Sequence, residues 1–149
     1  KILKNGTWLY QGSPITRHNM VKLFARVLKK DAAGHYWLIT PYEKGRIEVE
    51  DAPFTAVEVT REGAGRDQLL HFRTNVDDRV TAGQSHPLRV NFDGKTGEPS
   101  PYIMARDGLE ARLLRPVYYA LAEIAVEDER EKGLYGVWSA GRFFPIGKI

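Results

Sequence analysis

The sequence lacks cysteine, which excludes disulfide frameworks, thiolate nucleophiles and zinc or iron–sulfur sites with cysteine ligands. It also lacks any apolar run near the roughly 20 residues that a membrane span requires, and no segment resembles a signal peptide. These absences predict a soluble protein without a membrane span, and the missing cysteine favours the reducing cytoplasm. No recognised reaction signature is present either, so the sequence by itself dictates no single reaction.

The chain opens with Lys1 rather than Met, and a strand-like phrase begins at once, so we expect that some residues precede it. A chain of this length can bury roughly 70% of the surface that it exposes when unfolded. We therefore expect one compact domain, or two small lobes that share a core, with no need of a metal or disulfide for stability.

The net charge is only +3, but the charges are unevenly placed. Seven Lys and Arg residues come before the first acid, Asp31, whereas acids outnumber bases from Glu43 to Asp78. A basic N-terminal end could attract a nucleic acid or an anionic lipid. We favour instead a solvated helix face complemented by the other lobe, because nucleic-acid binders usually carry a stronger basic excess.

Turn residues and apolar periodicity predict an α+β fold with mostly antiparallel strands and two main helices. Asn5-Gly6 predicts a hairpin turn, and Thr16 is a candidate N-cap of a helix whose apolar face continues to Leu28. Pro116 suits the first turn of a second helix. The expected strands are 36–39, 46–50, 54–60, 69–75, a short piece near residue 80, 88–92, 102–105, 109–113 and 135–139, followed by an apolar tail, 143–146, that packs on the body.

We divide the chain into a small N-terminal lobe, residues 1–41, and a larger β-rich lobe, residues 42–149, that a C-terminal helix closes. Segments 2–38 and 103–138 look like copies of one unit of hairpin, helix and strand, although common turn residues could produce the same likeness by chance. Two such units would bracket the central strands and leave a crevice where they meet. The element order also matches a pleckstrin-homology-like roll.

Several chemical motifs are incomplete. Gly94-Lys95-Thr96 resembles the end of a phosphate-binding loop, but Arg89 stands where that motif needs glycine. The four histidines form no ligand pair at helical spacing, and we expect no metal and no cofactor. Glu48 and Glu50 would share one face of a strand, and two neighbouring carboxylates could serve in acid–base catalysis. A solvent-exposed strand would have the same spacing of acidic residues.

The densest group of polar residues combines charges of both signs with turn residues, as expected for a polar cleft in which arginine binds a carboxylate or phosphate. A structural network of ion pairs that braces the lobes would have the same composition. The candidate ligand-binding residues are Glu43, Lys44, Arg46, Glu50, Asp51, Asn75, Asp77, His86, Arg89 and Arg106.

Several sequence motifs that together cover most of the chain are specific to one protein family. They span residues 6–17, 21–24, 40–44, 47–54, 72–75, 86–89, 101–102 and 108–111. On these phrases the chain resembles the bacterial family called domain of unknown function 1285. The resemblance implies an α+β fold built from repeated motifs and a suggested role in signal transduction. It implies no established activity, cofactor or catalytic residue.

Three functional hypotheses follow. The first is a non-enzymatic binding or signalling module that holds a small anionic ligand or a peptide at the junction of its lobes, because no nucleophile, base and orienting group occur together. The second is a hydrolase-like enzyme that uses Glu50, Asp51 or His86. The third is weak nucleic-acid binding by the basic N-terminal lobe. A homo-oligomer is compatible with all three.

Overall fold

The computed structural model describes residues 1–149, of which 46% lie in strands and 14% in helices. The prediction of an α+β fold is therefore wrong, because the protein is mainly β. Both α-helices are only nine residues long, and strands form on either side of each of them.

The first elements are β1 (Leu9–Tyr10), β2 (Ser13–Pro14), α1 (His18–Arg26), β3 (Leu28–Lys30), β4 (Tyr36–Ile39) and β5 (Lys44–Ile47). The remaining elements are β6 (Phe54–Glu62), η1 (Gly65–Asp67), β7 (Leu69–Thr74), β8 (Arg79–Thr81), β9 (Leu88–Phe92), β10 (Pro99–Arg106), β11 (Leu109–Leu113), α2 (Arg115–Glu123), β12 (Val126–Glu127), β13 (Leu134–Ser139) and β14 (Arg142–Lys148).

The centre of the molecule is a six-stranded sheet in the order β8-β7-β6-β11-β10-β9. Its neighbouring strands are antiparallel except for β6 and β11, which run parallel. The sheet curls into a half-barrel. The predicted pleckstrin-homology-like roll is also wrong, because α2 is followed by a second sheet, β12-β13-β14, rather than ending the chain.

A single apolar core lies against the inner face of the curled sheet. Along β7, Leu70 and Phe72 are buried while His71 and Arg73 are partly exposed, because successive side chains of a strand point to opposite faces. Residues of α2 and of the C-terminal sheet join the same cluster, as do Ile2, Trp8, Ala25 and Leu28 near the N-terminus. The core is therefore continuous between the two ends of the molecule.

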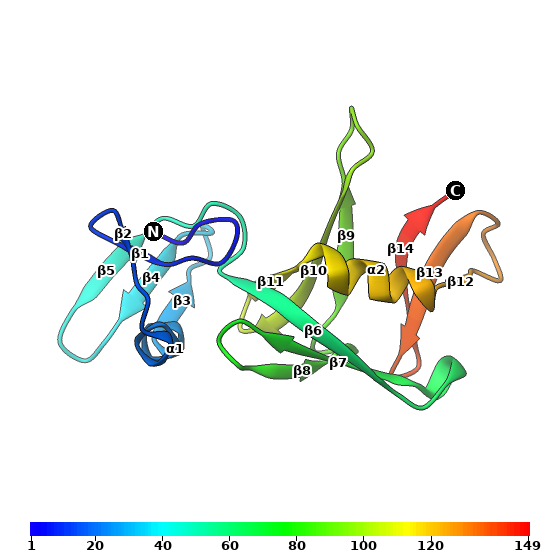
Figure 1. Cartoon of the computed structure of the whole chain (residues 1–149), viewed down its shortest axis with the longest axis horizontal. Coiled ribbons are helices and arrows are strands. Elements are labelled where there is room, and N and C mark those ends of the chain that lie inside the picture. Colours follow the sequence, from blue (N-terminus) through cyan, green and yellow to red (C-terminus); the bar gives the residue numbers. More distant parts are fainter.

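The C-terminal sheet packs beside the free edge of the central sheet, where β14 lies against β9. The predicted apolar tail is in fact the strand β14, and Phe144 and Ile146 are buried as expected. Close packing requires Gly136 in β13, because a Cβ there would lie 2.4 Å from the carbonyl oxygen of Phe144. Figure 1 shows α2 lying across the molecule beside these strands.

The N-terminal lobe, by which we mean residues 1–52, contains α1 and the sheet β3-β4-β5. The first helix begins at His18 without a side-chain cap and ends at Arg26, two residues before the predicted end at Leu28. Leu28 is instead the first residue of β3 and pairs with Leu38 of β4. The division after Pro41 that the sequence suggests stays a prediction.

The two lobes lie at opposite ends of the long axis in Figure 1, and the chain crosses between them before β6. Each α-helix precedes a three-stranded antiparallel sheet whose strands are in sequence order. A turn closed by the Ile2–Trp8 bridge precedes α1, and the β10–β11 hairpin precedes α2. The order of a helix followed by a three-stranded sheet therefore occurs twice, but the β1–β2 hairpin before α1 has no counterpart between β11 and α2.

Candidate binding site between the lobes

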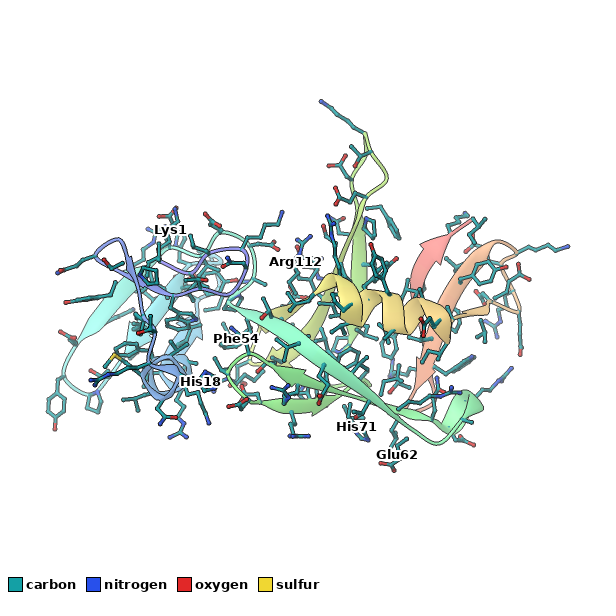
Figure 2. All side chains as sticks on the ribbon, viewed as in Figure 1. Lys1, His18, Phe54, Glu62, His71 and Arg112 are labelled. Atoms are coloured by element: carbon teal, nitrogen blue, oxygen red, sulfur yellow. The ribbon has the colours of Figure 1, made fainter.

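A three-residue polar network joins the lobes. The hydroxyl of Tyr102 donates to both carboxylate oxygens of Asp51, at 2.7 and 2.9 Å, and Arg112 Nη1 donates to Asp51 Oδ2 at 2.8 Å. Burial raises the pKa of the Tyr102 phenol, and its hydrogen bond to the Asp51 carboxylate raises that pKa further. Figure 2 places Arg112 between the lobes. The network fixes the last residues of the N-terminal lobe against the outer face of β10 and β11.

Arg89, on β9, extends this network over β10 to β11. Its Nε and Nη2 donate to the two carboxylate oxygens of Glu110 at 2.7 and 2.8 Å, and its guanidinium lies 4.3 Å from the centre of the Tyr102 ring. The pKa of Arg89 is raised, chiefly by the hydrogen bond to Glu110. The Nε and Nη2 edge of the Arg89 guanidinium is thus already bonded to Glu110.

Two open pockets flank the network. One, of about 470 Å³, lies on the Arg89 side, and its lining residues are Lys30, Asp31, Pro87, Arg89, Met104, Asp107, Gly108 and Glu110. The other, of about 520 Å³, lies beside α2, and we call it the α2 pocket. Its lining residues are Lys4, Glu98, Pro99, Pro101, Arg112, Leu113, Leu114, Arg115, Tyr118 and Tyr119.

The α2 pocket combines cations with aromatic rings. Lys4, Arg112 and Arg115 line it together with one carboxylate, Glu98, which lies 3.6 Å from Arg115. Tyr118 donates its hydroxyl to the carbonyl oxygen of Ile146 at 2.6 Å, so its ring is held in place. This composition suits an anion that carries an apolar or aromatic group.

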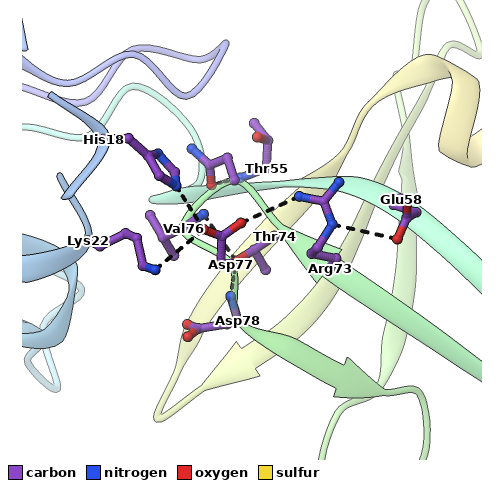
Figure 3. Close-up of polar contacts among 10 residues, drawn as sticks. His18, Lys22, Thr55, Glu58, Arg73, Thr74, Val76, Asp77 and Asp78 are labelled. Atoms are coloured by element: carbon purple, nitrogen blue, oxygen red, sulfur yellow. Dashed lines mark hydrogen bonds and ion pairs between the residues drawn. The ribbon is translucent and has the colours of Figure 1, made fainter. Parts of the chain in front are cut away.

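A second polar cluster connects α1 to the turn between β7 and β8 (Figure 3). Asp77 Oδ2 accepts a hydrogen bond from His18 Nε2 at 2.8 Å and lies 3.4 Å from Lys22 Nζ. Arg73 lies 3.5 Å from the other carboxylate oxygen of Asp77 and also 3.5 Å from Glu58. The hydrogen bond from His18 is the main reason why the pKa of Asp77 is lowered. Cations on both lobes therefore stabilise the Asp77 carboxylate.

Two further predicted site residues brace the same junction. Asn75 accepts a hydrogen bond from the Thr55 amide at 3.0 Å, and its own amide lies 3.4 Å from the Gly6 carbonyl oxygen. Gly6 has φ +93°, and a Cβ there would lie 3.0 Å from Asn75 Nδ2. Arg106 donates to the carbonyl oxygen of Ala25 at the end of α1. These contacts link the N-terminal turn and α1 to the central sheet.

The remaining predicted site residues lie elsewhere. Glu50 Oε1 accepts the Lys4 amide at 2.8 Å, and His86 Nδ1 donates to the carbonyl oxygen of Met104 at 2.8 Å. Glu43, Lys44 and Arg46 lie on β5 or the turn before it. The structure thus brings Asp51 near Arg89, and it places Asn75, Asp77 and Arg106 in separate contacts between the lobes, but it does not gather all ten residues into one cleft.

Tyr102, Glu110, Arg112 and Arg115 are not among the site residues predicted from the sequence. The first three lie on the β10–β11 hairpin, but counting outward from the Asp107-Gly108 turn would pair Tyr102 with Leu113. A bulge between Met104 and Arg106 shifts the register and pairs Tyr102 with Arg112 instead. Nothing in the local sequence indicates that Asp51 lies beside that pair. No group of three or more His, Asp or Glu side chains is placed to hold a metal ion, and no helix is long and apolar enough to cross a membrane.

These features define a mainly β protein of two lobes with a polar junction between them. Two family models match it: "Domain of unknown function (DUF1285), N-terminal domain" over residues 1–52, and "Protein of unknown function (DUF1285), C-terminal domain" over residues 53–146. The chain belongs to the DUF1285 family, which confirms the resemblance seen in its sequence. No curated protein matches it.

Two crystal structures of DUF1285 family proteins resemble this fold. The protein from Silicibacter pomeroyi DSS-3 is 44% identical, with a TM-score of 0.91 over 99% of this chain and 79% of that one. The protein from Shewanella baltica OS155 is 30% identical, with a TM-score of 0.62 over 82% of this chain and 88% of that one. The family name of both proteins carries no assigned activity.

Proposed function

We propose that this protein is a non-enzymatic binding or signalling module that holds a small anionic ligand, or an acidic peptide end, in the α2 pocket. The observation that carries the proposal is the composition of that pocket, which is lined by two tyrosine rings and three cations, of which Arg112 is paired with Asp51 and Arg115 with Glu98 while Lys4 has no ion pair. Arginine recognises carboxylates and phosphates through paired hydrogen bonds, and aromatic walls add apolar contact.

The fixed position of Arg112 supports the proposal. Asp51 and Tyr102 hold its Nη1 at 2.8 and 3.2 Å, so the side chain is ordered before any ligand arrives. A pre-ordered cation loses less conformational entropy on binding than a free one. The Asp51–Tyr102–Arg112 network would then both brace the lobes and prepare the site.

The enzyme hypothesis has less support. Glu50, Asp51 and His86 are each engaged by a different neighbour, namely the Lys4 amide, the Tyr102–Arg112 pair and the Met104 carbonyl oxygen. A hydrolase needs a nucleophile or activated water, a base and an orienting group that converge on one point. These three residues do not converge in that way.

Thermal unfolding across a panel of nucleotides, phosphorylated metabolites, amino acids and carboxylates tests the proposal. A ligand at a hundred times its dissociation constant adds about 2.7 kcal/mol, which raises the midpoint by several degrees. We expect Arg115→Ala to abolish the ligand-induced shift while leaving the midpoint without ligand unchanged, because Arg115 is 81% exposed. The matched control is Arg79→Ala, an exposed arginine with no ion pair and outside the pocket. A ligand shift that survives Arg115→Ala, or a flat panel, would contradict the proposal.

A further inference from the structure

The sheet β3-β4-β5 has one face covered and one face open. Leu28, Leu38 and Ile47 pack toward the core. The other face carries Lys29, Trp37 and Arg46 in one row across the three strands, because Lys29 pairs with Trp37 and Trp37 pairs with Arg46. The next row joins Ile39 to Lys44. Four of these five side chains are exposed, and Trp37 is partly exposed.

The cations of this open face have no acidic partner. Lys1 and Lys22 of the same lobe make ion pairs, but Lys29, Lys44 and Arg46 have no carboxylate within 4.0 Å. Residues 1–52 contain nine Lys and Arg against five Asp and Glu, whereas residues 53–149 contain 13 against 14. The net positive charge of the chain therefore lies on the N-terminal lobe, whereas residues 53–149 have a slight negative excess.

Trp37 is held firmly at the centre of this face. Its Nε1 donates to Asp31 Oδ2 at 2.9 Å, and the other oxygen of Asp31 accepts the amides of Ala33 and His35 at 3.0 and 2.8 Å. Lys44 Nζ lies 4.4 Å from the centre of the Trp37 ring. The Trp37 ring on β4 is thus fixed in orientation, with Lys29 on β3 to one side and Lys44 and Arg46 on β5 to the other.

We propose that this face binds single-stranded nucleic acid, with a base stacked on Trp37 and the neighbouring phosphates near Lys29, Lys44 and Arg46. Adjacent strands lie about 4.8 Å apart, so the backbones of Lys29 and Arg46 are about 10 Å apart with the ring between them. Aromatic platforms flanked by cations recognise single strands through stacking and phosphate contacts, with little sequence preference.

Charge and shape favour this occupant over two others. An acidic peptide would satisfy the cations, but it offers no planar base for the fixed Trp37 ring. A membrane surface would require apolar side chains projecting from the face, and Ile39 is the only aliphatic one in its two rows. The proposal concerns the sheet rather than α1, where Lys22 is already paired with Asp77. It also does not depend on the α2 pocket.

Fluorescence anisotropy with labelled dT12 and rU12, from 20 to 200 mM salt, tests this inference. We expect Lys29→Ala/Arg46→Ala to weaken binding and to reduce the slope of log affinity against log salt by about 1.4, since each lost phosphate contact contributes about 0.7 for a single strand. The control Arg79→Ala/Arg142→Ala removes the same charge from exposed, unpaired sites of the C-terminal lobe and should leave the slope unchanged. The relative affinity for dT12 and rU12 distinguishes DNA from RNA.

The stacking contact is tested separately. Trp37→Leu should weaken binding about tenfold, whereas Trp37→Phe, which keeps an aromatic face, should retain most of the affinity. Unfolding midpoints check that each variant is folded. If Trp37→Leu does not fold, the double variant Lys29→Ala/Arg46→Ala still tests the inference. Arg115→Ala should have no effect on oligonucleotide binding, which separates this surface from the α2 pocket.

Three results would overturn the inference. The first is no binding of either oligonucleotide at 20 mM salt. The second is equal weakening by the control pair, which would indicate attraction to overall charge rather than to this face. The third is equal or tighter binding of polyglutamate or of phosphatidylserine vesicles, which would assign the face to an acidic protein or to a membrane.

Discussion

The hydroxyl of Tyr102 should contribute measurably to stability, and Tyr102→Phe removes it while keeping the ring. The substitution deletes the hydrogen bonds to Asp51 at 2.7 and 2.9 Å and the one from Arg112 at 3.2 Å. The ring and its contact with Arg89 remain. Any loss of stability can therefore be attributed to the polar network between the lobes.

The size of the effect follows from the environment. A hydrogen bond to a charged group is worth about 1.5–3 kcal/mol. The side chains of Asp51 and Arg112 are 24% and 20% exposed and keep their direct bond, so water can replace part of what is lost. We therefore expect the lower limit, about 1.5 kcal/mol, which corresponds to a fall of about 3–6 °C in the unfolding midpoint.

Urea unfolding gives the free energy, and an unchanged m-value shows that the change concerns stability rather than compactness. A double-mutant cycle with Asp51→Ala and Arg112→Ala should give a coupling energy of about 1–3 kcal/mol. A Tyr102→Phe protein as stable as wild type, together with a coupling energy near zero, would refute the idea that this network braces the lobes.

Three further predictions concern packing and pH. Gly136→Ala should destabilise by about 2 kcal/mol or more in urea unfolding, because a Cβ there would overlap the Phe144 carbonyl oxygen, whereas Gly45→Ala, with open space around it, should stay within about 0.5 kcal/mol. Phe72→Ala should cost about 3–5 kcal/mol in the same assay, since the ring is fully buried. Because the folded-state pKa of Asp77 lies below its ordinary value of 3.8, its contribution is present above that pH and is lost as pH falls through the folded-state value. Unfolding midpoints of wild type and Asp77→Asn should therefore differ above pH 3.8, approach each other as the pH falls below that value and coincide below the folded-state pKa. A difference that stays constant through this range would contradict the assignment.

Much of the central sheet could be predicted from local sequence. The expected strands 88–92 and 109–113 have the observed bounds, because apolar alternation between clear turns defines them. The end of α1 could not be predicted in this way. Leu28 continues the apolar periodicity of the helix, but its pairing with Leu38 depends on a strand ten residues further along the chain.

The candidate site shows the same limit more strongly. The sequence singled out Asp51 and Arg89 as members of a polar cluster, and both adjoin Tyr102. Their distance in sequence from Tyr102 and Arg112 means that only the packing of the two lobes brings these groups together. The ten predicted site residues lie in several separate places in the structure. Mixed charges near turns indicate only that side chains are exposed, and this is equally true of residues that bind a ligand and of residues that join the lobes.

The most direct test of the proposed binding function is a ¹H–¹⁵N NMR titration with phenyl phosphate, an anion that carries one aromatic ring. We predict saturable changes in the amide signals of Lys4, Leu113, Arg115 and Tyr119, with weaker changes for inorganic phosphate and none for phenol. The absence of saturable changes around α2, or changes confined to other surfaces, would contradict the assignment of the α2 pocket as an anion-binding site.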